Sequence, residues 1–314
     1  MRASSQILIV FYNSMWGSAL DIPPGLPDGF ELSDDHRRIH DASAVVFHVP
    51  SLGQASLPPK LPGQLWVAWS MECDVNYPQL RDPDFMRAFD LTMTYRRDAD
   101  VRAGYVPCYG SAGDLDRTMR RPPRPKDAGG LVAMFISSRA NRSGRLRYAL
   151  ELARHIPLDS YGRFMRNRSL PRDDWRPTKL AVIARYKFTI AFENAIGEDY
   201  VTEKFFDPLV AGSLPIYLGA PNVEAFAPGD RCYLDVNNFE NPRALAECLW
   251  TLSRNEAAYE EYHAWRSKPF RREFLDFLDA ERIHPFVRLC RAVAGRQREG
   301  IRATAWQPAP EPLQ

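Results

Sequence analysis

The sequence predicts an α/β protein built from two Rossmann-like, parallel-sheet domains that face a cleft. Short runs of β-branched and aromatic residues alternate with helix-like segments, and this alternation occurs twice along the chain. A basic, proline-rich stretch over residues 113–129 separates the two series, as an exposed linker would. With 314 residues, 45% of them hydrophobic, the chain can bury a core in each domain.

The first series is predicted to form an N-terminal domain over residues 1–115. Its apolar runs are short, which suits strands that are buried on both faces of a parallel sheet. The expected strands are at 6–13, 44–49, 64–72 and 89–97. Proline-rich connections and helix-like pieces lie between them, and the linker proper is expected over residues 116–129.

The second series is predicted to form a C-terminal domain over residues 130–268. A strand at 130–138 precedes a helix at 144–156, whose apolar positions recur at helical spacing. Gly212 is expected to close a later helix of this domain. The remaining expected strand, helix and strand are at 187–194, 202–212 and 213–219.

Residues 269–314 are predicted to form C-terminal helices and a disordered tail, WQPAPEPLQ. The final helix is apolar on one side and basic on the other. Packing against the first domain explains this pattern most simply. Peripheral contact with an anionic membrane surface is the alternative.

Charge and cysteine content limit the class of partner. The chain has 41 basic and 39 acidic residues, so no overall field favours nucleic acid. Its five cysteines are scattered and odd in number, which predicts reduced thiols in a cytosolic protein. The N-terminal apolar run resembles a first strand more than an export signal, and no run is long enough to span a bilayer. We therefore expect a cytoplasmic protein that is at most peripheral to the inner membrane.

A dense run of polar side chains joins the strand at 187–194 to the helix at 202–212. Ligands of parallel α/β sheets bind at the carboxyl ends of strands, where the next helix offers free N–H groups and a positive dipole end. Lys204 adds a charge that favours phosphate, Asn194 offers a donor and an acceptor, and Glu203 suits sugar hydroxyls. These residues indicate a nucleotide sugar. Alternatively, Glu203 and Lys204 are an ordinary first-turn acid and a solvated lysine.

A second basic cluster favours the nucleotide-sugar interpretation. The segment SSRANRSGRLR follows the first strand of the same domain and places Arg142, Arg145 and Arg147 near its switch point. An arginine fork can hold a diphosphate without a metal. The chain has no GxGxxG or P-loop motif, which argues against NAD enzymes and P-loop NTPases. Two Asp-x-Asp triplets are too short to predict a metal site, at 82–84 and 98–100.

The segment FENAIGEDYVTEKFFDPLVAGSLPIYLGAP resembles the signature block of the α1,3/4-fucosyltransferases, glycosyltransferase family 10. FDLTMTYRRDADV resembles the family's Thr-Tyr-Arg-Arg-Asp-Ser-Asp segment, and SSRANRSGRLRYALELARHIPLDSYGR resembles its arginine block ending in Tyr-Gly-Arg. The match covers roughly residues 64–240. It implies a GT-B fold, an N-terminal acceptor-side domain, GDP-fucose as donor in the C-terminal domain, and inversion at the anomeric carbon.

The positions of these motifs also imply residue roles. Lys204 and Arg145 would hold the diphosphate, and Glu203 would bind the ribose hydroxyls. Asn194 and Tyr200 would line the donor pocket. The resemblance implies no required cofactor and no bound metal, although a divalent cation could stimulate turnover without being held by the protein.

Inversion in one displacement needs a base for the proton of the acceptor hydroxyl, and a carboxylate suits that task. Glu72 ends a strand of the first domain at its carboxyl edge, in a segment comparable to the one that holds the family's proposed base. The order Glu72-Cys73-Asp74 departs from the family's Glu-Ser-Pro, which makes Asp74 the rival. Glu72 could instead pair with an arginine across the domain interface.

Animal members of the family carry an N-terminal membrane anchor and luminal disulfides, and neither is visible here, so a bacterial cytosolic member is expected. The expected acceptor is a growing surface glycan with a β-galactoside or N-acetylglucosamine unit, and no nucleic-acid partner is expected. Two rival interpretations stay open. One is a transferase that uses another GDP-linked deoxyhexose, and the other is an inert glycan-binding protein on the same fold.

Overall fold

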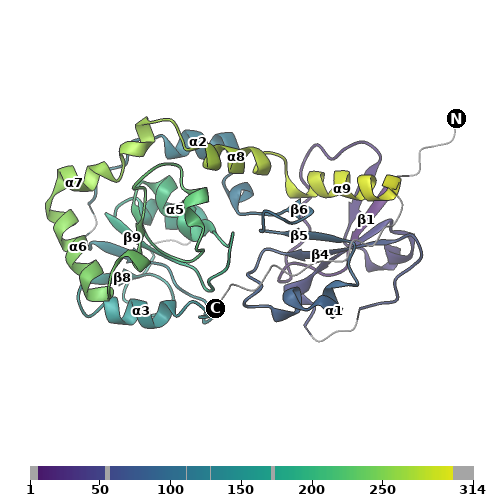
Figure 1. Cartoon of the computed structure of the whole chain (residues 1–314), viewed down its shortest axis with the longest axis horizontal. Coiled ribbons are helices and arrows are strands. Elements are labelled where there is room, and N and C mark those ends of the chain that lie inside the picture. The colour runs from purple at the N-terminus through teal and green to yellow at the C-terminus, as the bar shows by residue number, and fades with distance from the viewer. Residues whose placement is uncertain (1–5, 54–56, 111, 128, 171–173, 300–314) are drawn as a thin grey trace. The chain divides into compact units, whose positions relative to one another are not determined.

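The computed structural model describes residues 6–299, with gaps at 54–56, 111, 128 and 171–173. The chain divides into two compact units (Figure 1). The first combines Met1–Gly104 with Ile283–Gln314, and the second is Tyr105–Arg282. Each unit is built on one parallel sheet, which confirms the predicted α/β class with two parallel-sheet domains.

The first unit contains a six-stranded sheet in the order β2-β1-β3-β4-β5-β6, and every neighbouring pair is parallel. The strands are β1 (Ile7–Phe11), β2 (Phe30–Ser33), β3 (Ala44–His48), β4 (Leu65–Ser70), β5 (Leu91–Thr94) and β6 (Val101–Arg102). The chain runs outward from β1 to β2 on one side and continues with β3 on the other. The gap between β1 and β3 is therefore the topological switch point of this sheet.

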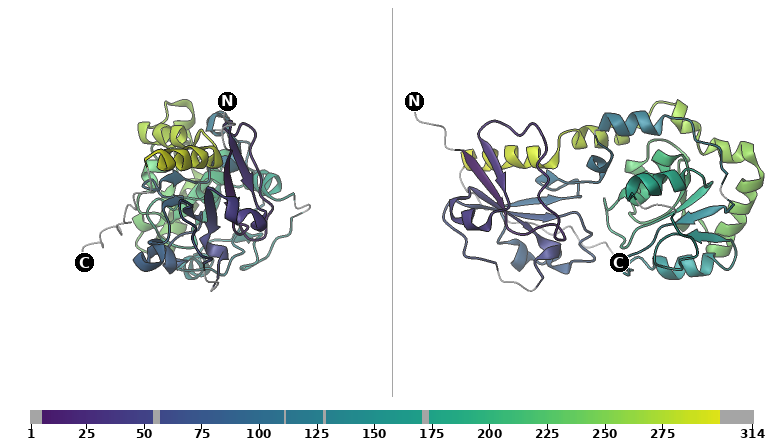
Figure 2. Two further views of the ribbon diagram at one scale, coloured as in Figure 1. Left: turned by 90° about the vertical axis from the view of Figure 1, so that its right-hand side faces the viewer. Right: turned by 180° about the vertical axis from the view of Figure 1, so that it is seen from behind.

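Helix α9 (Pro285–Glu299) lies along one face of the first sheet (Figures 1 and 2). Its side chains Phe286, Leu289 and Val293 pack into a core shared with Ile9 and Val67 of the strands. The apolar side of the final helix is thus buried against the first sheet, as the simpler of the two sequence alternatives predicted. The opposite face carries α1 (Pro83–Met86) and the 3-10 turns His36–Asp41, Val49–Ser51 and Pro78–Arg81.

The second unit contains a five-stranded parallel sheet in the order β11-β10-β9-β7-β8. The strands are β7 (Val132–Met134), β8 (Leu158–Ser160), β9 (Phe188–Phe192), β10 (Leu214–Leu218) and β11 (Leu234–Asp235). The strand order reverses between β7 and β9, which places the switch point there.

Helices cover both faces of the second sheet. On one face, α3 and α6 share a core with β7 and β9, whereas α5 packs on the other face (Figure 2). The helices of this unit are α2 (Ala112–Met119), α3 (Arg145–Leu152), α4 (Arg176–Ile183), α5 (Glu203–Ala211), α6 (Pro242–Arg254), α7 (Glu256–Glu261) and α8 (Arg272–Glu281). Its 3-10 turns are Val106–Tyr109, Val223–Phe226, Val236–Asn238 and Ala264–Ser267. Gly212 ends α5 with φ at 80°, as the sequence predicted.

The two units divide at other positions than the predicted domains. Helix α2 overlaps the predicted first domain and linker, but Leu115 and Met119 are buried in the core of the second unit beside Phe206. Helix α8, which the sequence grouped with the C-terminal helices, adds Phe274 and Phe277 to the same core. Amphipathic helices join the core that buries their apolar side. That burial moves the boundaries to Gly104 and Arg282.

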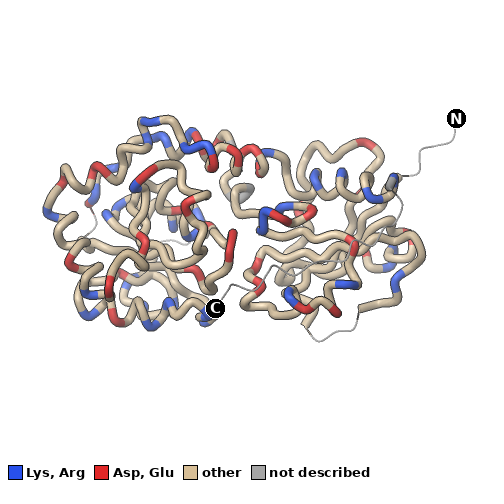
Figure 3. Tube along the Cα trace, in the orientation of Figure 1, with Lys and Arg blue, Asp and Glu red and all other residues tan. Residues whose placement is uncertain are grey.

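Acidic and basic residues are interspersed along both units (Figure 3), in keeping with the net charge of +2. Among the described side chains, the free cysteines are Cys73, Cys232, Cys248 and Cys290. The side chain of Cys108 and the predicted disordered tail lie outside the described residues. Across the described part of the chain, every helix is too short or too polar to cross a bilayer.

Candidate functional site

The candidate site lies at the carboxyl ends of β7 and β9, where the strand order of the second sheet reverses. Two hydrogen bonds tie the loop after β7 to the end of β9. The hydroxyl of Ser143 donates to the carbonyl oxygen of Glu193 at 2.6 Å, and the Ser143 N–H donates to the carbonyl oxygen of Asn194 at 3.2 Å. The structure therefore brings together the two polar segments that the sequence predicted to meet.

Arg145 is the first residue of α3 and is almost fully buried, with 2% of its surface exposed. Its guanidinium donates to the carbonyl oxygen of Phe192 at 3.2 Å and to that of Ser138 at 3.1 Å. These carbonyls belong to the end of β9 and to the loop after β7. The two other arginines of this segment, Arg142 and Arg147, are exposed. Arg145 alone among the three is held inside the switch point.

Glu193 belongs to the polar run between β9 and α5, and the sequence alone does not predict a role for it. Its side chain is fully buried, and its Oε1 accepts hydrogen bonds from the N–H of Thr202 at 2.8 Å and from the Thr202 hydroxyl at 2.9 Å. Oε2 lies 3.5 Å from Nζ of Lys204. Burial raises the pKa of Glu193, against the opposing positive charge of Lys204. The carboxylate thus fixes the start of α5 and faces its lysine.

Lys204 lies in the first turn of α5, two residues after Thr202, which caps the helix N-terminus. Its ammonium group is 3.1 Å from Oγ1 of Thr202 and 3.0 Å from Oε1 of Glu203. Burial disfavours the ammonium charge, but the carboxylates of Glu203 and Glu193 outweigh burial and raise the pKa of Lys204. The charge of Arg145 acts in the opposite direction on Lys204, so the two cations lie within electrostatic range of each other.

Glu203 is ionised near neutral pH. Burial opposes its negative charge, but the positive charges of Lys204 and Lys179 outweigh burial and lower the pKa of Glu203 to about 2. An ionised carboxylate accepts hydrogen bonds, and a sugar hydroxyl can donate them. Its side chain keeps 30% of its surface exposed, so a ligand can reach it.

A clasp between two distant loops holds the segment that leads to α5. The N–H of Asp199 donates to Oδ1 of Asn222 at 2.9 Å, and Nδ2 of Asn222 donates to Oδ1 of Asp199 at 2.9 Å. Asp199 has φ at 64°, in the left-handed region that few non-glycine residues occupy. Its neighbour Tyr200 is 1% exposed and meets the ring of Tyr105 edge-on. Asn194 is also buried at the end of β9.

A buried ion-pair cluster supports the site from α4. The carboxylate of Asp207 in α5 is fully buried and lies 2.8 Å from Arg176 and 2.7 Å from Lys179. The hydroxyl of Tyr109 donates to it at 2.7 Å. Lys179 also helps to keep Glu203 ionised. The only sequence signal for these cations is their spacing of three residues at the start of a helix, which is too common to single them out.

The predicted base and its rival lie after β4 in the first unit. The N–H of Glu72 donates to the hydroxyl of Ser70 at 3.1 Å, which holds the backbone of this turn. Asp74 forms an ion pair with Arg81 at 2.9 Å. Burial raises the pKa of Asp74, but the hydrogen bond and the positive charge of Arg81, with smaller contributions from Cys73 and Arg96, together outweigh burial and lower the pKa. A lowered pKa makes the Asp74 carboxylate a poorer proton acceptor than an ordinary aspartate.

The acidic triplets have structural partners. Asp82 caps α1 by accepting from the N–H of Asp84 at 2.9 Å. Asp98 pairs with Arg96 at 2.8 Å, and Asp100 accepts from the N–H of Thr92 at 2.8 Å. Within the described ranges, histidine, cysteine and carboxylate side chains do not gather in groups of three that could hold a metal ion.

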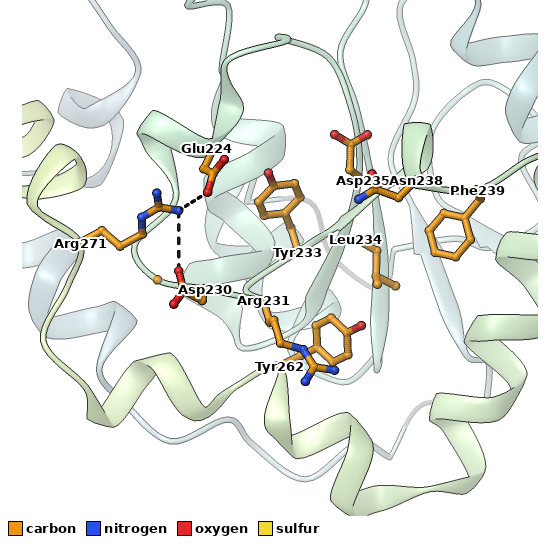
Figure 4. A pocket seen from close by; sticks show the side chains of 11 residues that line it. Glu224, Asp230, Arg231, Tyr233, Leu234, Asp235, Asn238, Phe239, Tyr262 and Arg271 are labelled. Atoms are coloured by element: carbon orange, nitrogen blue, oxygen red, sulfur yellow. Dashed lines mark hydrogen bonds and ion pairs between the residues drawn. The ribbon is translucent and has the colours of Figure 1, made fainter.

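Apart from the candidate site, the second unit has a pocket of about 400 Å³ beside the edge strand β11 (Figure 4). Three carboxylates and two guanidinium groups line it, those of Glu224, Asp230, Asp235, Arg231 and Arg271. Arg271 is 2.7 Å from Glu224 and 3.8 Å from Asp230, so its charge is already neutralised (Figure 4). A surplus of negative charge disfavours a diphosphate here. None of the predicted donor residues lines this pocket.

Comparison with known protein families gives two matches. Residues 125–305 match the family described as glycosyltransferase family 10 (fucosyltransferase), C-terminal, and residues 4–106 match the family described as fucosyltransferase, N-terminal. Together the two matches extend over most of the chain. They cover all six residues that the sequence assigned to the site.

Curated proteins with similar sequences carry fucosyltransferase names. A putative fucosyltransferase-like protein of Arabidopsis thaliana is 37% identical over 76% of this chain and 45% of its own length. The α-(1,3)-fucosyltransferase B of Drosophila melanogaster is 33% identical over 70% of this chain and 53% of its own. The human α-(1,3)-fucosyltransferase 4 is 34% identical over 80% of this chain and 46% of its own. The chain spans about half the length of these relatives.

Among solved structures, a crystal structure of an α1,3-fucosyltransferase is similar with a TM-score of 0.57 at 15% identity, over 84% of this chain and 81% of that one. A crystal structure of an α1,3-fucosyltransferase with GDP-fucose has a TM-score of 0.56 at 16% identity, over 88% and 89%. At this level of identity the likeness concerns the fold. It extends over both parallel sheets of the chain.

Proposed function

The chain belongs to glycosyltransferase family 10, the fucosyltransferases, and from this membership we propose that it is an inverting fucosyltransferase. The proposed reaction moves L-fucose from GDP-fucose to a hydroxyl of a glycan that contains N-acetylglucosamine or galactose, in α1,3 linkage. The observation that carries the proposal is that Arg145 and Lys204 lie in the first turns of α3 and α5, at the switch point between β7 and β9.

The cations are suited to a diphosphate leaving group. Bond cleavage leaves negative charge on GDP, and two fixed positive charges at the start of α3 and α5 would stabilise it as it develops. Arg145 is locked by two carbonyl oxygens and Lys204 by Thr202, so little reorganisation is needed. In this proposal these cations take the place of a bound metal, while a free divalent cation can still stimulate turnover.

The remaining donor residues take complementary roles. Glu203, held ionised by its neighbouring lysines, would accept hydrogen bonds from the ribose hydroxyls. Asn194 and Tyr200 would line the donor pocket at the end of β9 and in the loop that follows. The clasp between Asp199 and Asn222 would keep this loop in the binding conformation.

We assign the base to Glu72. In one displacement, the carboxylate takes the proton from the acceptor hydroxyl as that oxygen attacks the anomeric carbon, and GDP departs from the opposite side. Asp74 is engaged by Arg81, which favours its ionised form and lowers its power to accept a proton. This ion pair is the observation that argues against Asp74 as the base.

The setting of the enzyme completes the proposal. The free thiols of the described cysteines suit the cytoplasm, where a growing surface glycan would be the acceptor. Peripheral contact with an anionic membrane would involve only the basic residues of α9, because its apolar side is buried against the first sheet.

The donor site is tested by Lys204→Gln, with Lys268→Gln as the control. Lys268 is an exposed lysine of the same unit. Lys204→Gln should weaken GDP binding by about tenfold or more in calorimetric titration, and Lys268→Gln should leave it unchanged. Equal affinities in the wild type and Lys204→Gln would reject the assigned diphosphate site.

The donor is tested by incubating the wild type with GDP-fucose and with other GDP-linked deoxyhexoses in the presence of a glycan array. Transfer of fucose, read as a mass increase of the glycan, is expected. Transfer from another GDP-deoxyhexose, with none from GDP-fucose, would reject GDP-fucose as the donor and identify the other sugar nucleotide in its place. Saccharide binding without transfer from any donor would identify an inert glycan-binding protein.

A further inference from the structure

A group of aromatic side chains lies at the carboxyl edge of the first sheet, and the proposed function gives it no role. Its switch point lies between β1 and β3, where ligands of such sheets bind. The loop that follows β1 carries Asn13 and Trp16, and β3 ends with His48. The turn with Glu72 follows β4, the next strand of the sheet.

The loop after β1 is fastened to the end of β3. Nδ2 of Asn13 donates to the carbonyl oxygen of His48 at 2.8 Å, and the His48 N–H donates to Oδ1 of Asn13 at 2.8 Å. The hydroxyl of Ser51 accepts from the N–H of Trp16 at 3.2 Å and lies 2.7 Å from Nδ1 of His48. Side chains of one loop therefore fix the backbone of the other.

Trp16 is held in an uncommon conformation and exposes its ring. Its φ is 54°, in the left-handed region, which costs free energy for a residue with a large side chain. Its exposed fraction is 55%, whereas Trp66 and Trp69 of the same sheet are buried. Exposure of an indole costs hydrophobic free energy. A fastened, strained and exposed tryptophan at a ligand-binding edge is characteristic of a preorganised contact surface.

Other aromatic rings surround the tryptophan. His48 meets the Trp16 ring edge-on at 5.3 Å between centroids, and the ring of Tyr77 lies at 6.2 Å. Tyr77 lies on the same segment after β4 as Glu72, and its N–H donates to the carbonyl oxygen of Asp74 at 3.2 Å, which holds this segment in a turn. The negative charge of Glu72, after burial, also raises the pKa of Tyr77. Tyr77 thus connects the aromatic surface with the proposed base.

We propose that Trp16 and Tyr77 form the platform on which the acceptor glycan binds. The apolar face of a neutral pyranose ring would lie on the exposed indole of Trp16. The next sugar of the glycan would then present a hydroxyl to Glu72. This inference rests on the proposed function, because it takes Glu72 as the base. It adds the residues and the chemical class of the acceptor contact.

The charges of this surface favour a neutral ligand. Burial lowers the pKa of His48 to about 4, so the imidazole is uncharged near neutral pH. Of the groups that form the surface, Asn13, Trp16, Ser51 and Tyr77 are also uncharged at that pH. The carboxylate of Glu72 would repel an anionic ligand. Tryptophan combines a large apolar face with one N–H donor, and a sugar ring offers the matching C–H face and hydroxyl rim.

The test compares Trp16→Ala with Trp16→Phe and with Trp175→Ala. Trp175 is another exposed tryptophan, in the second unit, with φ at 61°. With N-acetyllactosamine as acceptor, Trp16→Ala should raise the acceptor KM by about tenfold or more, and Trp16→Phe by about threefold or less, because it keeps an aromatic face. Trp175→Ala should leave the acceptor KM unchanged.

Two readouts separate a platform from a general structural effect. The KM for GDP-fucose and the slow hydrolysis of GDP-fucose without acceptor should stay within about twofold of the wild type in Trp16→Ala. An unchanged acceptor KM, or an equal rise in both KM values, would overturn the inference.

A binding experiment keeps the inference separate from the proposed function. N-acetyllactosamine is titrated into protein saturated with GDP, and binding is followed by saturation-transfer NMR. Loss of the signal in Trp16→Ala, with retention in Trp175→Ala, supports the platform even if no donor is turned over. Equal signals in the two variants would refute the platform even if fucose transfer is observed.

Discussion

Thr202→Val should loosen the start of α5 and with it the donor site. Valine keeps the shape of the side chain but removes a hydroxyl that is fully buried. Oγ1 accepts hydrogen bonds from the N–H of Lys204 at 3.2 Å and from its Nζ at 3.1 Å. It also donates to the carboxylate of Glu193 at 2.8 Å. The substitution removes all three interactions.

The magnitude follows from two of these interactions. Loss of the N-cap hydrogen bond should cost about 1 kcal/mol. Leaving the buried carboxylate of Glu193 with one hydrogen bond fewer should cost about 1–3 kcal/mol. The sum, about 2–4 kcal/mol, corresponds to an increase of about 30-fold to 1000-fold in the equilibrium constant for opening of this region.

Amide hydrogen exchange of α5 measures this opening without requiring the two units to unfold together. The amides of Phe205, Phe206, Asp207 and Leu209 should exchange faster by the stated factor in Thr202→Val. Thr202→Ser, which keeps the hydroxyl, should stay within about tenfold of the wild type. Thr251→Val is the matched control, since Thr251 is exposed in α6 and its hydroxyl donates to the carbonyl oxygen of Glu247 at 2.9 Å. Exchange of α5 in Thr202→Val no faster than in Thr251→Val would refute the reasoning.

Three further predictions test other parts of the chain. Glu72→Gln should lower the rate of fucose transfer by about 100-fold or more with GDP binding intact, and Asp74→Asn should lower it less; the reverse ranking in steady-state assays would move the base to Asp74. His48 should make the first unit acid-labile, because burial lowers its pKa in the folded chain to about 4, below the ordinary histidine pKa of about 6.5. Its contribution, up to about 3 kcal/mol, is present above pH 6.5 and is lost as the pH falls toward 4. In His48→Gln, the midpoint of urea unfolding should depend less on pH between 4 and 6.5 than it does in the wild type. The same pH dependence in the two proteins would contradict the assignment to His48. Asp207→Asn should destabilise the second unit by up to about 3 kcal/mol, because its buried carboxylate no longer offsets the charges of two partly buried cations, whereas Asp276→Asn in an exposed pair should cost less than about 0.5 kcal/mol in the same urea titration. Similar costs for these two variants would mean that the buried cluster is not a stabilising unit.

Local sequence patterns predict most of the strands of the two sheets. Buried parallel strands need continuous apolar runs, so β1, β3, β4, β9 and β10 could be located from composition alone. Strands β2 and β6 were not predicted, because FELS and VR are too short and too polar to stand out. The helix α2 was assigned to the boundary region because its flanking residues are basic and proline-rich. Its burial in the second unit depends on which core its apolar side meets.

The same division applies to the candidate site. Lys204, Glu203 and Asn194 follow a strand and open a helix, and this order already predicts a place where charge meets a helix N-terminus. The roles of Glu193 and Asp199 could not be predicted in this way. Glu193 becomes a buried acceptor only once Thr202 folds back over it, and Asp199 is clasped by a residue 23 positions away.

The sequence by itself determined the class of the fold, the positions of the buried strands and the cations at the start of α3 and α5, because periodicity and helix start signals are local properties of the chain. Tertiary structure decided which charges are buried, which unit each helix joins and where Trp16 is exposed. Those properties depend on residues distant in sequence, such as Asn13 and His48, which are 35 positions apart. Burial and pKa are set by such neighbours, and only the folded chain brings them together.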